Sequence, residues 1–267
     1  MRKLLLSATM LAMVLFIAIS CKPTTVKNQC ELDPVSIDST KISNQQKELD
    51  NFYTLMAYAV VYKDWQTNAL RDSSRGYNIG SVLVDKNNKV VHWARNSVNI
   101  TNNESQHGEV RLMQSYLDQQ KCFSLQNHTI YTTLEPCAMC SGMMKLTEVH
   151  RTVYGQTDPS YGKALERMQL NTYKACEKGY TPYPRPVISD KSHDNISEQI
   201  DDAYSKHPGE HITTFLATNE AKELFEKATE MFKNFDPTYQ ENAEIVEYAK
   251  QYYTTVSDSY VNLACLH

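Results

Sequence analysis

The chain has 267 residues, of which 41% are hydrophobic and 22% are charged, and its formal net charge is -4. This apolar content is enough to bury a core, which excludes a disordered or low-complexity protein. Its 27 basic and 31 acidic residues exclude a polybasic nucleic-acid binder. The length allows one large domain or two small ones.

Residues 1–20 have the layout of a secretory signal peptide. Two basic residues precede an apolar run from Leu4 to Ile19, which is short for a membrane-spanning helix. The junction before Cys21 resembles a bacterial lipoprotein signal, although Ala18 stands where such signals usually carry Leu. We therefore expect Cys21 to be lipidated and the protein to be exported, anchored to a bacterial membrane and facing the periplasm or the cell exterior. The alternative is an uncleaved N-terminal membrane anchor.

Hydrophobic spacing and turn residues predict the elements that follow. Residues 21–45 are polar and have no periodicity, so we expect a tether. The predicted elements are a helix over 46–65 with one apolar face, a loop over 66–77, an antiparallel hairpin of strands 79–84 and 89–94, a loop over 97–106, a helix over 107–119, a strand over 129–134, a helix over 137–146, a strand over 149–154, a helix over 160–173, an irregular segment over 180–186, and helices near 194–205, 217–234 and 240–256. The alternation of strands and helices after residue 107 indicates parallel crossovers in an α/β layer.

Four cysteines are scattered along the chain outside any motif. In an exported protein they could form two disulfides in three possible pairings, or they could be free thiols. The sequence leaves this open for Cys30, Cys122, Cys176 and Cys265.

Two short motifs each open a predicted helix. They are His107-Gly108-Glu109 and Pro136-Cys137-Ala138-Met139-Cys140. This H-x-E…P-C-x-x-C pairing is the established signature of zinc deaminases.

The residue types in the two motifs suit a catalytic zinc ion. One imidazole and two thiolates fit tetrahedral Zn²⁺, and a helix N-terminus favours the thiolate form of Cys137 and Cys140. Three protein ligands leave the fourth position open for water, and Glu109 is placed beside it to move protons. The alternatives are a redox pair of cysteines, or a structural zinc with Cys122 or His128 as fourth ligand.

Residues 46–168 resemble the cytidine/deoxycytidylate deaminase superfamily, and within it the branch of tRNA-specific adenosine deaminases and nucleobase deaminases. The resemblance is carried by Gly80-Ser81-Val82-Leu83-Val84, Asn96, the two motifs with their extension to Met144, and Val153-Tyr154-Gly155. It implies that zinc is held by His107, Cys137 and Cys140, that Glu109 shuttles protons, that Asn96 hydrogen-bonds the substrate, and that the main chain near Leu134 and Glu135 contacts the leaving amino group. Gly108 departs from the family, which usually has Ala there.

The resemblance also implies the architecture. We expect a three-layer α/β/α sandwich with a mixed central sheet over residues 46–180. Residues 181–267 are expected to form a helical extension packed on that domain. The extension is acidic, since residues 193–267 carry 14 acidic and 5 basic side chains. Relatives are usually oligomeric, so a homo-oligomer is one possibility, but the sequence does not give the oligomeric state.

The implied activity is that of a hydrolase acting on carbon–nitrogen bonds in cyclic amidines, releasing ammonia from a nucleobase or nucleoside. The net charge and the predicted export argue against a nucleic-acid partner, but deamination of adenosine in tRNA is the enzymatic alternative. Two further readings are an exported deaminase effector and a non-catalytic zinc-containing lipoprotein that binds a partner. The sequence does not identify the base or nucleoside.

Overall fold

The computed structural model describes residues 33–34, 42–70, 72–173 and 178–260. The predicted signal peptide, the lipidation site Cys21 and three of the four scattered cysteines lie outside these residues; the fourth, Cys122, is exposed and free. The elements are β1 (Asp33–Pro34), α1 (Asn44–Tyr62), β2 (Gly80–Val84), β3 (Val90–Arg95), α2 (Gly108–Gln120), β4 (Thr129–Leu134), α3 (Ala138–Leu146), β5 (Arg151–Gln156), α4 (Ala164–Met168), β6 (Leu170–Asn171), β7 (Ile188–Lys191), α5 (Asn195–Ser205), α6 (Ile212–Phe215), α7 (Asn219–Lys233), the 3-10 turn η2 (Gln240–Asn242) and α8 (Ala243–Thr254).

A mixed sheet of five strands lies at the centre, in the order β3-β2-β4-β5-β7. Strand β2 is antiparallel to both β3 and β4, whereas β4, β5 and β7 run parallel to one another. The start of β2 and the ends of β3, β4 and β5 therefore meet at one edge of the sheet. The hairpin and the α/β fold class predicted from the sequence are confirmed.

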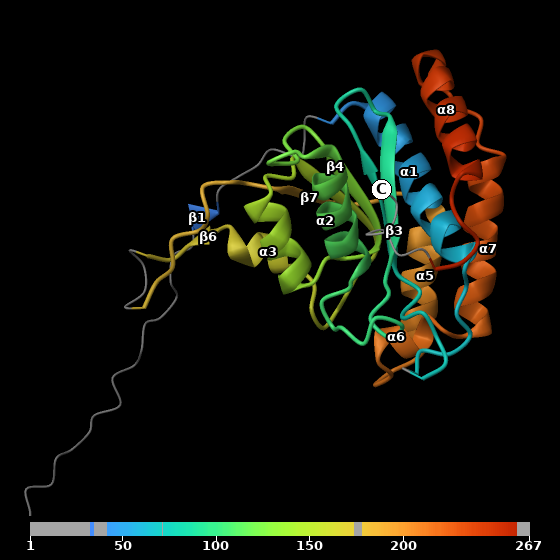
Figure 1. The fold of residues 1–267 in the computed structure, drawn as a ribbon, viewed down its shortest axis with the longest axis horizontal. Coiled ribbons are helices and arrows are strands. Elements are labelled where there is room, and N and C mark those ends of the chain that lie inside the picture. Colours follow the sequence, from blue (N-terminus) through green and yellow to red (C-terminus); the bar gives the residue numbers. More distant parts are fainter. Residues whose placement is uncertain (1–32, 35–41, 71, 174–177, 261–267) are drawn as a thin grey trace, which may run out of the picture.

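Helices cover both faces of the sheet, as a three-layer sandwich requires (Figure 1). Helices α2 and α3 pack on one face through a core that includes Leu112, Met113 and Met144. Helix α1 packs on the other face, where α5 also contacts β5, and α7 and α8 pack on α1 (Figure 1). The long C-terminal helices thus form an outer layer rather than a separate unit.

Helix α1 is buried on both sides, not on the single face that its spacing predicted. Tyr53 meets Tyr131 of the sheet with ring centroids 5.1 Å apart, while Phe52 stacks on Phe232 of α7 at 5.2 Å. The run from Phe52 to Val61 is buried throughout, because the sheet and α7 lie on opposite sides of it. A helix that is apolar all round is one that is covered all round.

The structure corrects the sequence prediction between residues 160 and 191. The predicted helix over 160–173 shortens to α4, because the Asp158 carboxylate accepts the backbone N–H groups of Ser160 and Tyr161 and holds a loop there. Beyond it, β6 pairs antiparallel with β1, inside the predicted tether. Strand β7, inside the predicted helical extension, adds the fifth strand to the central sheet.

The short helix α6 was also not predicted. Across the described ranges, no helix combines the length and the apolar character needed to cross a bilayer.

Candidate active site

Two helix N-termini bring the predicted ligands together. His107 is the N-cap of α2 and Cys137 is the N-cap of α3, and neither side chain is used for capping. Cys140 lies in the first turn of α3. Two N-cap positions are therefore occupied by side chains that are free to bind a ligand. Both lie next to helix N-termini, which favour negative charge.

The three donor atoms have the spacing of a zinc site. His107 Nδ1 lies 3.6 Å from Cys137 Sγ and 3.5 Å from Cys140 Sγ, and the two sulfurs are 3.6 Å apart. Zinc–ligand bonds of about 2.3 Å to sulfur and about 2.0 Å to nitrogen, at tetrahedral angles, place such atoms about 3.5–3.8 Å apart. The residues therefore fit a zinc ion. It is the one group of at least three such donors found within the described residues.

The two thiols are within hydrogen-bonding distance of each other. Their hydrogen bond lowers the pKa of Cys137 to about 4, and the same hydrogen bond together with burial raises the pKa of Cys140. The hydrogen bond to Cys137 raises the pKa of His107. Zinc binding displaces such protons, because the metal takes thiolate and neutral imidazole.

Glu109 lies beside the ligands without belonging to their group. Its side chain is 3% exposed, and its Oε1 accepts a hydrogen bond of 3.2 Å from Thr132 Oγ1 of β4. Burial raises the pKa of the Glu109 carboxyl. The arrangement gives a proton-accepting group next to three metal donors.

The side-chain amide of Asn96 has one atom that is hydrogen-bonded and one that is not. Its Oδ1 accepts the backbone N–H groups of Tyr77 at 3.1 Å and Val98 at 3.3 Å. Its Nδ2 is buried and has no partner among the described residues. Because the two backbone donors fix which atom is the oxygen, the unpaired atom is a hydrogen-bond donor.

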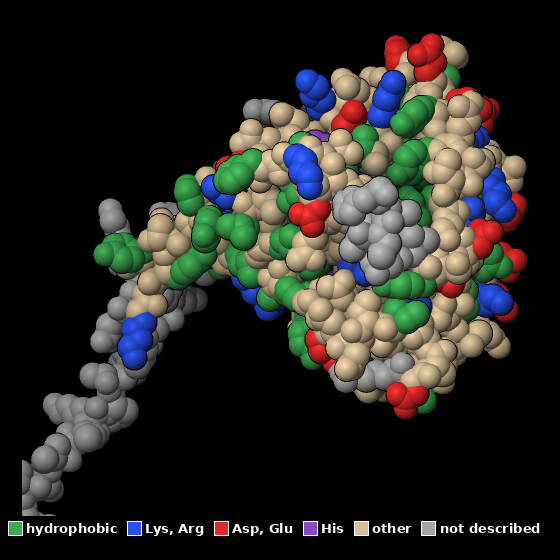
Figure 2. All heavy atoms as spheres, in the orientation of Figure 1, with side chains coloured by type: hydrophobic (Ala, Val, Ile, Leu, Met, Phe, Trp, Pro, Cys, Tyr) green, Lys and Arg blue, Asp and Glu red, His purple; other side chains and the backbone are tan. Residues whose placement is uncertain are grey.

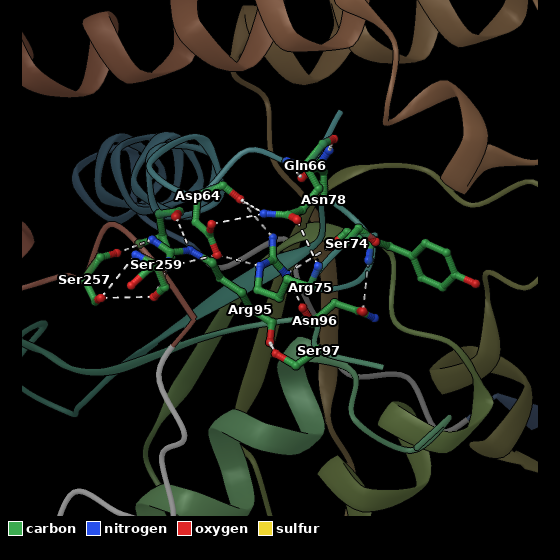
Figure 3. Close-up of polar contacts among 12 residues, drawn as sticks. Asp64, Gln66, Ser74, Arg75, Asn78, Arg95, Asn96, Ser97, Ser257 and Ser259 are labelled. Atoms are coloured by element: carbon green, nitrogen blue, oxygen red, sulfur yellow. Dashed lines mark hydrogen bonds and ion pairs between the residues drawn. The ribbon is translucent and has the colours of Figure 1, made fainter. Parts of the chain in front are cut away.

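A buried charge network holds the main chain around Asn96 (Figure 3). Arg75 lies between Asp64 and Asn96: it forms an ion pair of 2.8 Å with Asp64 and donates to the carbonyl oxygens of Asn96 and Tyr77. Arg95 donates to the carbonyl of Ser257, beyond α8. Sequence reasoning missed three of these residues. Arg75 and Tyr77 lie in the predicted loop over 66–77, and Asp64 lies near the end of the helix predicted over 46–65, where no motif marks it.

The structure gives Glu135 a role in shaping the loop after β5. Its carboxylate accepts the backbone N–H groups of Asp158 at 3.1 Å and Lys163 at 2.6 Å, and its own N–H donates to Gln156. Its side chain is therefore engaged by the loop, and Leu134 before it is buried at the end of β4. Their main-chain contact with a leaving amino group stays a prediction.

Neither alternative fourth ligand joins the site. Cys122 is exposed and bonds the carbonyl of Gln120, and His128 bonds Tyr116 and the carbonyl of Gln126. The structure thus favours three protein ligands over a closed structural zinc site.

Gly108 is tightly enclosed. A Cβ added at Gly108 would lie 3.2 Å from Gly80 Cα and 3.4 Å from Ser81 Oγ. Here α2 approaches β2 so closely that the small residue helps the two elements to pack.

The chain is similar to known deaminases. Residues 55–156 match the family described as the cytidine and deoxycytidylate deaminase zinc-binding region. A tRNA-specific adenosine deaminase of Rickettsia bellii (strain RML369-C) is 30% identical over 99 residues, which are 37% of this chain and 68% of that protein. A tRNA-specific adenosine deaminase 2 of Xenopus laevis is 32% identical over 110 residues, which are 38% of this chain and 63% of that protein.

Among solved structures, one from a study of A-to-I editing by tRNA:A34 deaminases is similar at 25% identity and a TM-score of 0.34. The similarity covers 45% of this chain and 85% of that one.

Proposed function

The chain belongs to the cytidine and deoxycytidylate deaminase family, and we propose that it is a zinc enzyme that hydrolyses the amino group from a free nucleobase or nucleoside. The observation that carries this proposal is the meeting of one imidazole and two thiols, all within 4.8 Å of one another, beside a buried carboxylate. Three ligands with an adjacent proton carrier are the layout of a catalytic zinc site.

The chain's own residues would move the protons. Zinc, when bound, supplies a Lewis acid that makes water nucleophilic near neutral pH. Glu109 would accept one proton from the attacking water and give it to a ring nitrogen of the substrate. It would then carry a second proton, from the hydroxyl added to the ring carbon, to the amino group that leaves as ammonia. Burial supports this role, because desolvation raises the pKa of the carboxyl and brings its neutral form within reach.

Asn96 would orient the ring. Its Nδ2 is a buried donor without a partner among the described residues, and a substrate acceptor would satisfy it. The ring must therefore present a carbonyl oxygen or an unprotonated nitrogen on the side that faces Asn96.

Charge supports a small substrate over tRNA. The chain is acidic overall, with a net charge of -4, whereas binding to a nucleic-acid backbone is driven by phosphate neutralisation. Figure 2 shows the basic side chains of this face as separate spots among acidic and apolar ones. The named relatives act on tRNA by their descriptions, so adenosine in tRNA is the second candidate substrate.

A panel experiment tests the proposal. The purified protein is assayed for zinc and for ammonia release from adenine, guanine, cytosine, their nucleosides, and a tRNA anticodon stem-loop. We expect about one zinc per chain and release from one base or nucleoside. Stoichiometric zinc with no release from any substrate would support the non-catalytic, partner-binding lipoprotein instead.

We further propose that the chain is an exported lipoprotein anchored through Cys21. The support is the basic start, the apolar run and the residues that precede Cys21. Cys21→Ser should move the protein from the membrane fraction to the soluble fraction. Cys122→Ser is the matched control, because Cys122 is an exposed free thiol. Mass spectrometry that finds Cys21 without lipid in the wild type would refute the proposal.

A further inference from the structure

A small arm of the chain stands at the opposite end of the molecule from the acidic C-terminal helices. It consists of β1 with residues 170–173 and 178–186, and β1 pairs antiparallel with β6 inside it. Figure 1 shows β1 and β6 at one end of the fold and α7 and α8 at the other. We call it the tyrosine arm, because its described aromatic side chains are all tyrosines.

Large apolar side chains are exposed on the tyrosine arm. The exposed fractions are 66% for Tyr173, 49% for Tyr180 and 52% for Tyr183. Leu146, at the end of α3, is 56% exposed. Arg185 joins it to the arm, because its guanidinium donates to the Leu146 carbonyl and lies 5.9 Å from the centre of the Tyr183 ring. Figure 2 shows apolar side chains gathered at this end of the molecule, as expected of an interaction surface.

The backbone of the arm keeps these rings exposed. Tyr183 lies between Pro182 and Pro184, which lack N–H groups and hold φ near about -65°, so the segment cannot continue as a helix. The N–H of Tyr180 donates to Thr172 Oγ1 at 2.8 Å, and its carbonyl accepts the N–H of Thr172 at 3.0 Å. Rings held by a fixed backbone lose little freedom when they dock on a partner.

The charge at this end differs from that of the C-terminal helices. Lys163, Arg167 and Lys178 are exposed, and Arg185 forms an ion pair of 3.1 Å with Glu148. The acidic side chains of the arm and of α4 beside it are Asp33 and Glu166. Residues 193–267, by contrast, carry 14 acidic and 5 basic side chains. A negatively charged surface would therefore attract the arm and repel the far end.

The lipid that we propose on Cys21 would bring a bilayer to this same end. Strand β1 starts at Asp33, so residues 22–32 are the whole link between the lipid and the arm. A link of that length spans at most about 40 Å even when fully extended. The arm is therefore the part of the described fold that the anchor holds nearest to the membrane along the chain.

We propose that the tyrosine arm, together with Leu146, is a docking face for an anionic lipid bilayer. The tyrosine rings lie at the level of the lipid headgroups, which suits side chains with an apolar body and a polar hydroxyl. The exposed cations face the lipid phosphates, and α7 and α8 are held away from the bilayer. The inference rests on the proposed lipid anchor and goes beyond it, because it assigns a face of the folded domain to the membrane.

Co-sedimentation with vesicles tests the docking face in the absence of the lipid anchor. The protein is the exported form, residues 21–267, with Cys21→Ser, and it keeps every described residue. It should bind vesicles of phosphatidylethanolamine and phosphatidylglycerol more tightly than vesicles of phosphatidylcholine alone. Joint replacement by Tyr173→Ser and Tyr183→Ser should weaken binding to the anionic vesicles about tenfold, because apolar contact is lost. Lys178→Glu should weaken it about fivefold or more.

Two variants at the far end are the matched controls. Tyr248→Ser replaces an exposed tyrosine of α8, and Lys206→Glu reverses an exposed cation after α5 with the same change in net charge as Lys178→Glu. Both should bind vesicles as tightly as the parent protein.

Three results would overturn the docking face. They are no binding of the parent protein to anionic vesicles, equal losses in the arm variants and the controls, or self-association without vesicle binding that the tyrosine replacements abolish. The last result would make the arm an interface between copies of this chain. Mass spectrometry of Cys21 is independent of all three, so the lipid anchor can stand when the docking face is wrong.

Discussion

Glu109 and the three metal donors have separable roles at the residue scale. Because Glu109 lies outside the group of donor atoms, Glu109→Gln should keep zinc and fold while it removes proton transfer. General acid–base catalysis is worth about 10²–10⁴-fold, and one residue serves two transfers here, so the loss should reach the upper end. Zinc content and deamination rate are measured in the same preparation.

Cys137→Ala is the comparison for Glu109→Gln. It removes one of three ligands, so zinc and activity should disappear together, with lower stability. The proton-carrier role is wrong if Glu109→Gln keeps activity within a few-fold of the wild type. It is also wrong if that variant loses its zinc, because Glu109 would then act as a ligand or a support.

Gly76 controls the position of the Asn96 amide. It has φ of 154°, and a Cβ there would lie 2.4 Å from Asn96 Oδ1. Gly76→Ala should therefore displace the amide and raise KM about tenfold at a smaller change in kcat. Gly209→Ala is the control, because Gly209 also has positive φ but no atom within 4 Å of an added Cβ. An equal effect of both variants on KM would mean that backbone strain, not the Asn96 contact, is responsible.

At the scale of elements, one buried cluster joins α1 to three strands. Arg151 of β5 pairs with Asp50 of α1 through two bonds of 2.8 Å and with Asp190 of β7 at 2.7 Å. Tyr131 of β4 donates to the same Asp50 carboxylate at 2.8 Å. The cluster fixes where α1 sits on the sheet.

Removal of the Asp50 carboxylate should leave the buried Arg151 guanidinium without one of its two acidic partners. Asp50→Ala is expected to lower the free energy of unfolding by about 3–5 kcal/mol, the usual cost of breaking a buried ion pair. Glu230→Ala removes an exposed partner of Lys233 and should cost less than about 1 kcal/mol. Urea unfolding of both variants measures the difference, and similar costs would contradict the role of the cluster.

The elements nearest the motifs were the ones that the sequence predicted well. Strand β4 has the predicted bounds, and α2 and α3 begin one residue after theirs, since His107 and Cys137 are N-caps. These elements follow local pattern and capping. Strand β7 was missed, because it has only four half-buried residues, two of them charged, and such a segment has no strand pattern in the sequence. Its pairing with β5 makes it a strand in the folded chain.

The residues of the site also divide into those that local sequence patterns predicted and those that only the folded structure shows. The three metal donors and Glu109 lie in two contiguous motifs, so their spacing along the chain was sufficient to find them. Arg75 and Asp64 act through contacts between segments that only the folded chain brings together. Their buried charges carry no pattern that separates them from the solvated charges of an ordinary loop.

The stability of the whole molecule should depend on pH through His92. Its ring is buried between β3 and α2, where its Nε2 meets Ser115 Oγ at 2.7 Å and its ring faces Tyr116. Burial lowers the pKa of His92 from 6.5 to about 4. Between these values the unfolded chain binds a proton that the folded chain does not, so stability rises with pH across this window and is flat on either side.

The expected size of this effect is up to about 3 kcal/mol, from 1.36 kcal/mol for each pKa unit. Urea unfolding at pH 4.5, 5.5, 6.5 and 7.5 should show the rise in the wild type. His92→Gln keeps a hydrogen-bonding side chain that does not titrate, so its stability should vary less over the same range. An identical slope in both proteins would assign the dependence to other groups.

The burial of α1 has a consequence for how the polypeptide is made. Helix α1 ends at residue 62, but α7 and α8, which cover its outer side, are residues 219–233 and 243–254. During translation the apolar outer side of α1 is not covered by α7 and α8 until nearly the whole chain has left the ribosome. Closure over such a sequence separation slows folding and leaves a transient intermediate prone to aggregate. A fragment that ends after residue 156 would contain the three metal ligands, but it would expose the apolar outer side of α1 to solvent.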